Sequence, residues 1–494
     1  MKTIGLIPLD SRPCNTLWLE QLAKIAGYQL LMYPRNKCGD LFKAADFLDQ
    51  IEWLKDNVRQ MDYLLVSFDG LTSGGLVQTR VGNADLQLIN ANIQIFKELK
   101  NLRPGLKIFV FDVLMRTSIT TSSLETAKYW SLVNEFSRLT GEIHFNNLDE
   151  DKQKLSEIKK EIPKFIIDSY LNARMKKNIL NKLAIDLSKQ AVIDYLIILQ
   201  EDAMPNGIQK IEQFELIKLI NDYKLNDRVK FYNGTDEGAL LLYAKAILQD
   251  LDLSPSIYLH LPFAEALEKS MLFEDRPFRE NLNLMFETIN FKFSSLEAAD
   301  FVLGIYTEAE NYDLNLNTYK EVLPRFDNTF YDYFEQLNNL LIQKDTCFVD
   351  LLFPNGGSIE ILNKINYKDL CCYSAWNTAS NSVGTALAQI ASVIVAKNKN
   401  LDYKHLNSNF LKERILDDCL YQYRIRRIVN EKLISKNINI YNLEASATKV
   451  LKEITKLLKE LSKNYLVDDF SIKLPWNRTF EAEIIIEGEK DEAL

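Results

Sequence analysis

Ten short apolar runs alternate with amphipathic stretches along the 494-residue chain. Most of these runs are continuously apolar and rich in β-branched and aromatic residues, which is typical of strands buried on both faces of a parallel sheet. The alternation of strand and helix patterns predicts an α/β protein with a mostly parallel sheet. The predicted strands are TIGLIPL, YQLLMYP, MDYLLVSF, LKIFVFD, IDYLIILQ, RVKFYN, PSIYLHL, ADFVLGIY, TCFVDLLF and LCCYSAW.

The pattern also predicts a division of the chain. Residues 1–400 form the α/β, catalytic-type region, residues 401–466 are helical and charged, and residues 467–494 form a strand-forming tail that packs back on the core. Helical patterns within the first region include residues 40–58 and 238–251, and the Lys-rich stretch around 150–190 is expected to be a surface helical excursion. A (β/α)-barrel-like closure and a two-lobed open sheet both fit, and either places an active site at the carboxyl ends of the strands.

Acidic and basic residues gather at the ends of the predicted strands. A lone Asp after a strand is commonly the cap of the next helix, and Asp236 in GTDEGALLL is a good candidate for that role. Several of the predicted strands are followed by an acid, and these acids are expected at the same edge of the sheet, which favours a functional site instead. Like charges gathered at one edge repel each other and need an opposite charge nearby. The charged residues in question are Asp10, Arg12, Asp69, Arg80, Asp112, Arg116, Glu201, Asp202, Asp236 and Glu237, with Asp350 inside TCFVDLLF.

The stretch SAWNTASNSVG stands where the last predicted strand turns into the apolar helix VGTALAQIASVIVA. The first turn of a helix offers free N–H donors and a partial positive charge. Asn377 and Asn381 can donate and accept hydrogen bonds to sugar hydroxyl or acetamido groups, and the flat indole of Trp376 suits a sugar ring. The alternative interpretation is a polar helix cap beside a core tryptophan.

Composition narrows the classes of function. The net charge of -9, from 68 acidic and 59 basic residues, disfavours nucleic acid and anionic membranes as partners. No apolar run reaches about 18 residues, and the opening run is too short for a secretory signal, so we expect no membrane span and a cytoplasmic location. Six Cys without a CxxC are interpreted as reduced core cysteines. The sequence does not determine the oligomeric state.

Other catalytic machinery has weak support. The chain has only three His, at 144, 260 and 405, which disfavours a His-rich zinc site and a Ser-His-Asp triad, although His260 ends a predicted strand. It has no GxSxG, GxxxxGK[ST] or GxGxxG after the first strand. Carboxylates would therefore carry the chemistry, with no cofactor predicted unless Mg²⁺ or Mn²⁺, which prefer oxygen ligands, takes part.

In this order, several motifs give the chain a resemblance to the bacterial family known as domain of unknown function 4127. The motifs are PLDSRP, SFDGLTSGGLVQTR, FDVLMRTS, QEDAMPNG, NGTDEGALLL, SAWNTASNSVGTALA, RILDDCLYQYR and PWNRTFE. The resemblance implies a shared fold and a shared polar site over most of the chain, and it supplies no activity. It adds further candidate site residues: Arg414, Asp417, Asp418, Arg424, Trp476, Arg478 and Glu481. The chain departs from the family pattern at Glu201, where an Asp is expected, and at Gln209, where a His is expected.

Three functions compete. The first is a glycoside hydrolase-like enzyme for a small sugar or amino-sugar conjugate, with Glu237 as general acid and Asp202 as the second carboxylate. Its expected substrate-binding residues are Asp10, Arg12, Asp69, Arg80, Asp112, Arg116, Asp236, Trp376, Asn377 and Asn381. The second is a hydrolase that depends on a divalent metal held by Asp10, Asp69, Asp112 and Asp202. The third is a non-catalytic carbohydrate-binding protein.

Overall fold

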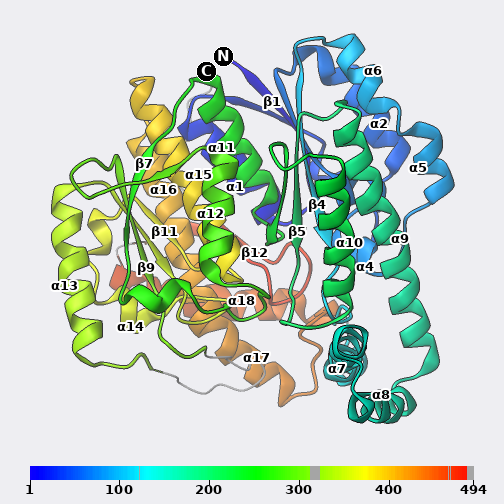
Figure 1. Ribbon diagram of the computed structural model, residues 1–494. Coiled ribbons are helices and arrows are strands. Elements are labelled where there is room, and N and C mark those ends of the chain that lie inside the picture. The colour runs from blue at the N-terminus through cyan, green and yellow to red at the C-terminus, as the bar shows by residue number, and fades with distance from the viewer. Residues whose placement is uncertain (122, 312–322, 466, 468, 487–494) are drawn as a thin grey trace. The chain divides into compact units, whose positions relative to one another are not determined.

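The computed structural model describes residues 1–121, 123–311, 323–465, 467 and 469–486 (Figure 1). The chain forms two compact units. The first contains residues 1–23, 27–246 and 273–276, and the second contains residues 24–26, 247–272 and 277–494. Each unit is built on its own open parallel sheet, so the fold is α/β without barrel closure. This corresponds to the open-sheet alternative left by the sequence.

The first unit has a six-stranded, all-parallel sheet with the order β2-β1-β3-β4-β5-β6. Apart from β2, which is partly exposed at the edge, its strands are almost entirely buried, which explains their continuous apolar composition. The order reverses between β1 and β3, and the carboxyl ends of strands at such a point are the usual ligand site of open α/β sheets. The strands are β1 (Thr3–Ile7), β2 (Gln29–Met32), β3 (Tyr63–Ser67), β4 (Lys107–Leu114), β5 (Tyr195–Gln200) and β6 (Val229–Asn233).

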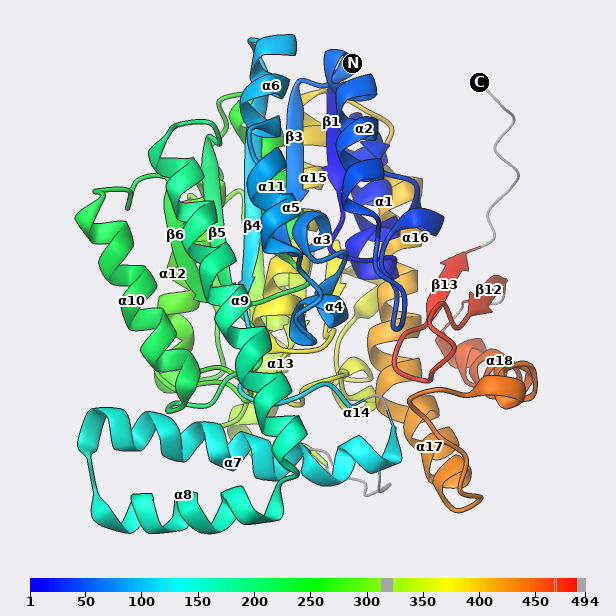
Figure 2. The ribbon, with the colours of Figure 1, turned by 90° about the vertical axis from the view of Figure 1, so that its right-hand side faces the viewer.

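Helices cover both faces of this sheet. Apolar residues of α2, α6, α9 and α10 form one core with the strands, and α11 packs on the opposite face, where Gly238 lies against Phe111 and Leu199. Helices α7 and α8 run side by side as an antiparallel pair (Figure 2). The helices are α1 (Leu17–Ile25), α2 (Phe47–Asn57), α3 (Phe68–Thr72), α4 (Leu76–Arg80), α5 (Leu86–Asn92), α6 (Ile95–Leu102), α7 (Leu124–Asn146), α8 (Asp149–Glu161), α9 (Lys164–Lys189), α10 (Ile208–Asp222) and α11 (Gly238–Asp250).

The second unit has a five-stranded parallel sheet with the order β11-β10-β9-β7-β8. Counted within its own unit, this order is 2-1-3-4-5 read from the β8 edge, which repeats the order of the first five strands of the other sheet. A separate antiparallel hairpin joins β12 (Phe470–Lys473) to β13 (Glu483–Ile486). The five parallel strands are β7 (Ser256–His260), β8 (Lys292–Phe293), β9 (Phe301–Tyr306), β10 (Thr346–Asp350) and β11 (Cys372–Ser374).

A long helix dominates one face of this second sheet. It runs through α16 (Lys404–Arg414), an eleven-residue π-helical segment η6 (Ile415–Ile425) and α17 (Arg426–Ile434). Such wide helical turns are rare and are frequently found at functional sites. Apolar residues of η6, α13 and α18 form one core with β9, β10 and β11, while α12 and α15 pack together away from that core. The other helices are α12 (Phe278–Ile289), α13 (Asn328–Gln343), α14 (Ile359–Leu362), α15 (Ala379–Asn398) and α18 (Ala447–Ser462).

The ten predicted strands are all present, and only the two-residue, exposed β8 was missed. The expectation of a surface excursion at 150–190 is wrong for α9, because its inner face is buried against the first sheet. The chain divides near residue 247, whereas the sequence suggested a boundary at 400. The helical stretch and the described part of the 467–494 tail belong to the second unit, and residues 468 and 487–494 lie outside the described residues.

Among the described helices, α15 is long and apolar enough to cross a membrane, but 94% of its apolar window is buried inside the protein. The core helix of a soluble protein meets the same criteria of length and composition, so this is weak support for a span.

Candidate functional site

Arg12 lies at the centre of the first polar cluster, in the loop that follows β1. Its guanidinium donates to both oxygens of Asp10 at 2.8–3.0 Å and to both oxygens of Asp236 at 2.5 and 3.0 Å. Asn15 also donates to Asp10 at 2.9 Å. Burial lowers the pKa of Arg12, but Asp10 and Asp236 outweigh it and raise that pKa above its ordinary value. One arginine therefore connects the loops that follow β1 and β6.

Arg80 and Arg116 form a second cluster around the acids that follow β5. Arg80 contacts both carboxylate oxygens of Glu201, and its Nη1 donates to Thr120 at 3.1 Å. Arg116 contacts Glu201 at 3.4 Å and makes a close ion pair with Asp202. Burial by itself would raise the pKa of Glu201, but the two arginines outweigh it and lower that pKa.

The two clusters act on one another through Arg116. Burial, together with the nearby charges of Arg80 and Arg12, lowers the pKa of Arg116 to about 10. Glu201 and Asp236 oppose this shift. Most of the polar residues predicted from the first six strands therefore gather at one edge of the sheet, where positive and negative groups alternate.

Asp69 and Asp112 form a third, deeper cluster with a residue that the sequence analysis missed. Lys177 of α9 contacts both carboxylates, and all three side chains are at most 1% exposed. Burial raises the pKa of Asp112 to about 7, Lys177 opposes the shift, and Asp69 adds to it. Asn181 donates to Asp112 at 2.7 Å. Lys177 lies one turn before the buried Leu180 on α9, and this spacing is the pattern that could have revealed it.

Asp69 also accepts a hydrogen bond from the backbone of β4. It lies in the first turn of α3, where its Oδ2 accepts the Val113 amide of β4 at 2.8 Å and its Oδ1 accepts the Thr79 hydroxyl at 3.0 Å. Asp112 lies inside β4, two residues before its end, and not at the strand terminus as the sequence suggested. These contacts give Asp69 and Asp112 a bracing role between β3, β4 and α9.

The neighbours Asp236 and Glu237 have different partners. Asp236 was the candidate for capping α11, but its carboxylate faces Arg12. Glu237 accepts the Thr235 amide at 2.9 Å, and its other oxygen, Oε1, is buried without a hydrogen-bond partner among the described residues. Burial raises the pKa of Glu237 to about 8, with a smaller contribution from Asp236 and Glu274. Glu237 is therefore mostly a neutral carboxylic acid at pH 7.

The described ranges contain no group of three or more His, Cys, Asp or Glu side chains that could hold a metal ion. The carboxylates of Asp10, Asp69, Asp112 and Asp202 each contact an arginine or a lysine instead. A divalent cation would have to replace these basic side chains, so this donor set does not fit the metal-dependent alternative.

The Trp-Asn turn belongs to the second unit, between β11 and α15. Its polar side chains bond largely to one another: Asn381 donates to the Thr378 hydroxyl at 3.0 Å, and the Ser382 hydroxyl donates to the Trp376 carbonyl at 2.9 Å. Asn377 has a left-handed backbone (φ 60°), and its carbonyl accepts the Asn355 amide at 2.8 Å. The half-buried Asn377 side chain makes no hydrogen bond with the described residues, so it is the amide of this turn that remains available.

Asp350, at the end of β10, is held by backbone groups and by no basic side chain among the described residues. It accepts the amides of Leu352 at 3.0 Å and Ser358 at 2.7 Å. Burial raises its pKa to about 7, against the effect of these two hydrogen bonds. Asp418 of η6 is also buried, and its pKa is raised to about 7 by burial although Arg414 opposes the shift. The sequence analysis noted Asp350 without placing it in the site.

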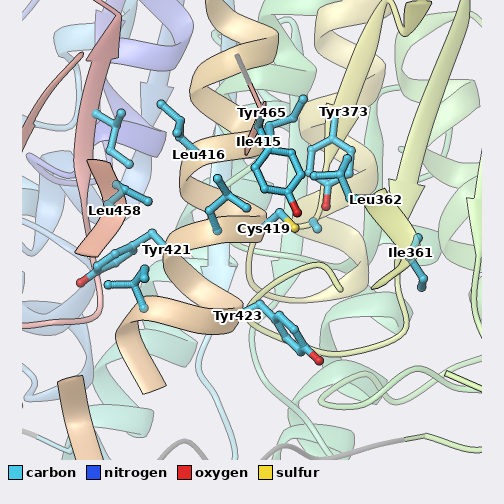
Figure 3. Close-up of a cluster of buried hydrophobic side chains, with 14 of the residues drawn as sticks. Ile361, Leu362, Tyr373, Ile415, Leu416, Cys419, Tyr421, Tyr423, Leu458 and Tyr465 are labelled. Carbon is cyan, nitrogen blue, oxygen red and sulfur yellow. The ribbon is translucent and has the colours of Figure 1, made fainter. Parts of the chain in front are cut away.

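The residues added by the resemblance meet around η6. Tyr421 and Tyr423 point to opposite sides of this segment (Figure 3), and the Tyr421 hydroxyl donates to the Thr479 carbonyl of the β12–β13 loop at 2.6 Å. In that loop, Arg478 grips Glu481 and lies over the Trp476 ring. The Trp376 ring packs against Phe480 of the same loop at 5.5 Å. Segments far apart in the sequence thus form one largely buried cluster of polar and aromatic side chains within the second unit.

Comparisons with known proteins add a family and no activity. No curated protein matches the chain. Among solved structures, a crystal structure of NAD⁺-bound 3-phosphoglycerate dehydrogenase from Entamoeba histolytica matches with 11% identity over 82% of this chain and 98% of that chain. Its TM-score of 0.14 is too low to carry any argument. The family model described as "Protein of unknown function (DUF4127)" matches residues 4–485, and the chain belongs to that family.

Proposed function

We propose that the first unit carries the active site of a glycoside hydrolase-like enzyme that acts on a small sugar or amino-sugar conjugate. The observation that supports it is the contrast between Glu237 and Asp202. Glu237 is buried, has no basic partner among the described residues and has a pKa raised to about 8, while Asp202 is 24% exposed and paired with Arg116. Environments that separate two acids in this way are those that assign an acid and a base in glycoside hydrolysis.

In this proposal Glu237 protonates the oxygen of the departing group while the bond to the sugar carbon breaks. Asp202 is the second carboxylate, which acts as the nucleophile or as the base that activates water. Arg116 makes a close ion pair with Asp202 and so holds this carboxylate in place. Arg12 and Arg80 orient an anionic or acetamido substituent of the substrate.

The burial of Glu237 adds a requirement. Glu237 is only 1% exposed, and its Oε1 lies against Gly234 in the loop between β6 and α11. Gly234 has a φ of 151°, which a glycine adopts readily and other residues do not. We propose that this loop moves when substrate binds and brings the carboxylic acid to the departing oxygen.

A non-catalytic binding protein is the second candidate. It is favoured by the ion pairs around Glu201, Asp202 and Asp236, because carboxylates that are already neutralised by arginine suit a fixed recognition surface. In this case the clusters bind a polar ligand and no bond is broken.

The first experiment is a hydrolysis screen of the purified protein against nitrophenyl glycosides, amino sugars included, with and without EDTA. Release of nitrophenol from one sugar, insensitive to EDTA, is the expected result. A signal that requires metal would favour the metal-dependent alternative. Silence across the panel, together with binding of a sugar by calorimetry, would favour the binding protein and overturn the enzymatic proposal.

Two variants test the assigned roles. Glu237→Gln and Asp202→Asn are expected to keep ligand affinity and lower turnover by about a hundredfold or more, as is typical when a general acid is removed. Glu215→Gln is the matched control, because Glu215 is an exposed acid of α10 paired with Lys182. Full turnover in both site variants would show that these assignments are wrong.

A further inference from the structure

Arg426 and Arg427 lie next to each other where η6 passes into α17 in the second unit. They are only 1% and 2% exposed. Their Nε and Nη2 atoms are buried and have no hydrogen-bond partner, and no carboxylate among the described residues forms an ion pair with either side chain. A buried charge without a partner is strongly destabilising, so two such arginines in sequence need an explanation.

Other arginines of this chain show which group usually accepts hydrogen bonds from the side of the guanidinium that carries Nε and Nη2, called its edge below. In each of them this edge grips both oxygens of one glutamate in the bidentate manner that arginine favours. The pairs are Arg80 with Glu201, Arg174 with Glu212, and Arg478 with Glu481. Arg426 and Arg427 present the same edge, and no group of the described residues fills it.

Aromatic rings hold the faces of the two guanidinium groups. Arg426 lies over Phe480 at 4.8 Å, with one weak contact from Nη1 to the Phe480 carbonyl at 3.5 Å. Arg427 lies over Tyr423 at 4.6 Å and Phe353 at 5.9 Å, and these two rings stack on each other. Rings fix the planes of the guanidinium groups but supply no full negative charge.

The nearest acids are already engaged. Glu481 is bound by Arg478, and Asp417 accepts from Arg414 and Gln422. Burial lowers the pKa of both Arg426 and Arg427 to about 10. Glu481 and Asp417 offset this only in part for Arg426, and Glu360, which accepts the Ser358 hydroxyl, does so for Arg427. Arg426 further lowers the pKa of Arg427, so the two charges lie close enough to repel each other.

A small hollow at the carboxyl end of β10 is linked to Arg427 through the Phe353 ring. Phe353, the ring beneath Arg427, forms part of its wall together with Leu351, Pro354 and Ala379. Its volume of about 20 Å³ admits little more than one water molecule. Ala379 is the first residue of the 20-residue helix α15, whose cap residue Thr378 makes no side-chain hydrogen bond to the first turn. The start of this helix carries a partial positive charge, which favours an anion in the hollow.

We propose that Arg426 and Arg427 form a binding site for a phosphate dianion, either free phosphate or the phosphoryl group of a small metabolite. Two unfilled guanidinium edges match the charge and the several oxygens of such a group better than a single carboxylate does. The ligand enters from the hollow when the Phe353 ring moves away from Tyr423. This site lies within the second unit and does not rest on the function proposed for the first.

The test is binding of inorganic phosphate and of glucose 6-phosphate to the full-length protein, by calorimetry and by thermal unfolding, against chloride at equal ionic strength. We expect phosphate to raise the midpoint of unfolding beyond the chloride control. Arg427→Met and Arg426→Met should each weaken binding about tenfold or more, because each removes charge-assisted hydrogen bonds. Both variants should unfold at the same or a higher temperature than the parent without phosphate, since each removes an uncompensated buried charge.

Arg174→Met is the matched control. Its edge is filled by Glu212, so the variant should unfold at a lower temperature and keep the response to phosphate. If a methionine variant does not fold, Arg427→Lys keeps the charge, removes the fork and should still weaken phosphate binding. Tighter binding of glucose 6-phosphate than of phosphate would support a phosphorylated metabolite, and the reverse would support free phosphate. No response of the parent to either anion, or an undiminished response in both variants, would overturn the proposal.

Discussion

The two parallel sheets share a strand order, yet their carboxyl edges accommodate charge differently. In the first unit nearly every acid at this edge faces an arginine or lysine, as Asp10 and Asp236 face Arg12. In the second unit Asp350 is held by two backbone amides, and Arg426 and Arg427 are held by aromatic faces. Most acids of the first edge are therefore neutralised by side-chain ion pairs. In the second unit, Asp350, Arg426 and Arg427 have no ion-pair partner among the described residues.

This difference in charge pairing gives the two edges different chemical properties. Paired charges hold their segments in a fixed geometry, although burial can still raise the pKa of a paired acid, as it does for Asp112. A carboxylic acid held only by amides changes protonation near neutrality, and an unfilled guanidinium edge attracts an anion. Glu237 is the exception in the first unit, which is why it carries the proposed acid role.

The largest expected effect concerns Lys177, which compensates two buried carboxylates. Lys177→Met should lower the apparent free energy of unfolding by about 3–5 kcal/mol, because Asp69 and Asp112 would remain buried without a cation. Urea denaturation followed by fluorescence measures this loss. Lys182→Met, which breaks an exposed pair with Glu215, should cost no more than about 1 kcal/mol. Equal losses in the two variants would contradict the view that the first unit depends on buried charge pairing.

A smaller effect is expected from Glu237, and it depends on pH. Its folded pKa of about 8 lies above the ordinary value of about 4.3, so between these pH values the unfolded chain has lost a proton that the folded chain keeps. Stability from this group is complete below about pH 4 and is lost as the pH rises through 8. Glu237→Gln should remove this decline, so the variant should gain stability relative to the parent as the pH rises from 4 to 9. Thermal midpoints across pH 4–9 would measure it, and parallel curves for parent and variant would contradict it.

Asp350 tests the same behaviour in the second unit over a narrower range. Its folded pKa of about 7 is raised from about 3.9, so stability from this group is present below about pH 4 and is lost as the pH rises through 7. Asp350→Asn should flatten this decline, by less than Glu237→Gln does because the pKa shift is smaller. The same series of thermal midpoints applies. A steeper pH dependence in the variant would mean that a cation neutralises Asp350 after all.

The smallest expected effect is at Asn377, whose side chain is unbonded among the described residues. Asn377→Gly should change stability by no more than about 0.5 kcal/mol, because glycine adopts the left-handed backbone readily. Asn377→Ala should cost about 1 kcal/mol for the same reason. Both changes are measured by urea denaturation. A large loss in the glycine variant would show that the side chain supports the fold rather than remaining available to a ligand.

Much of the fold could be predicted because buried parallel strands have a recognisable sequence pattern, a short and continuously apolar run. Runs such as YLLVS of β3 and YLIILQ of β5 are apolar at every or nearly every position since both faces of the strand are covered. The two-residue β8 has no such pattern, because both of its residues are exposed. The helix predicted from Val383 begins at Ala379, because the small polar residues before Val383 bond within the first turn.

The candidate site was predictable only in part. Acids near the ends of β1, β3, β5 and β6 were found because loops at that edge of a parallel sheet converge. Their partners were harder to find: Lys177 lies in a Lys-rich stretch that resembles an exposed helix, and only packing of α9 on the sheet makes it a buried counter-ion.

By itself, then, the sequence determined the alternation of strands and helices, the parallel character of the sheets and the polar character of their carboxyl edges, because these follow from local periodicity and burial. The tertiary structure decided which charges meet. Arg12 faces Asp236 across 224 residues, Glu237 turns toward Thr235 rather than an arginine, and the edges of Arg426 and Arg427 remain unfilled. Such pairings depend on distances between segments remote in sequence, and the energy of a charge depends on what surrounds it in the folded protein.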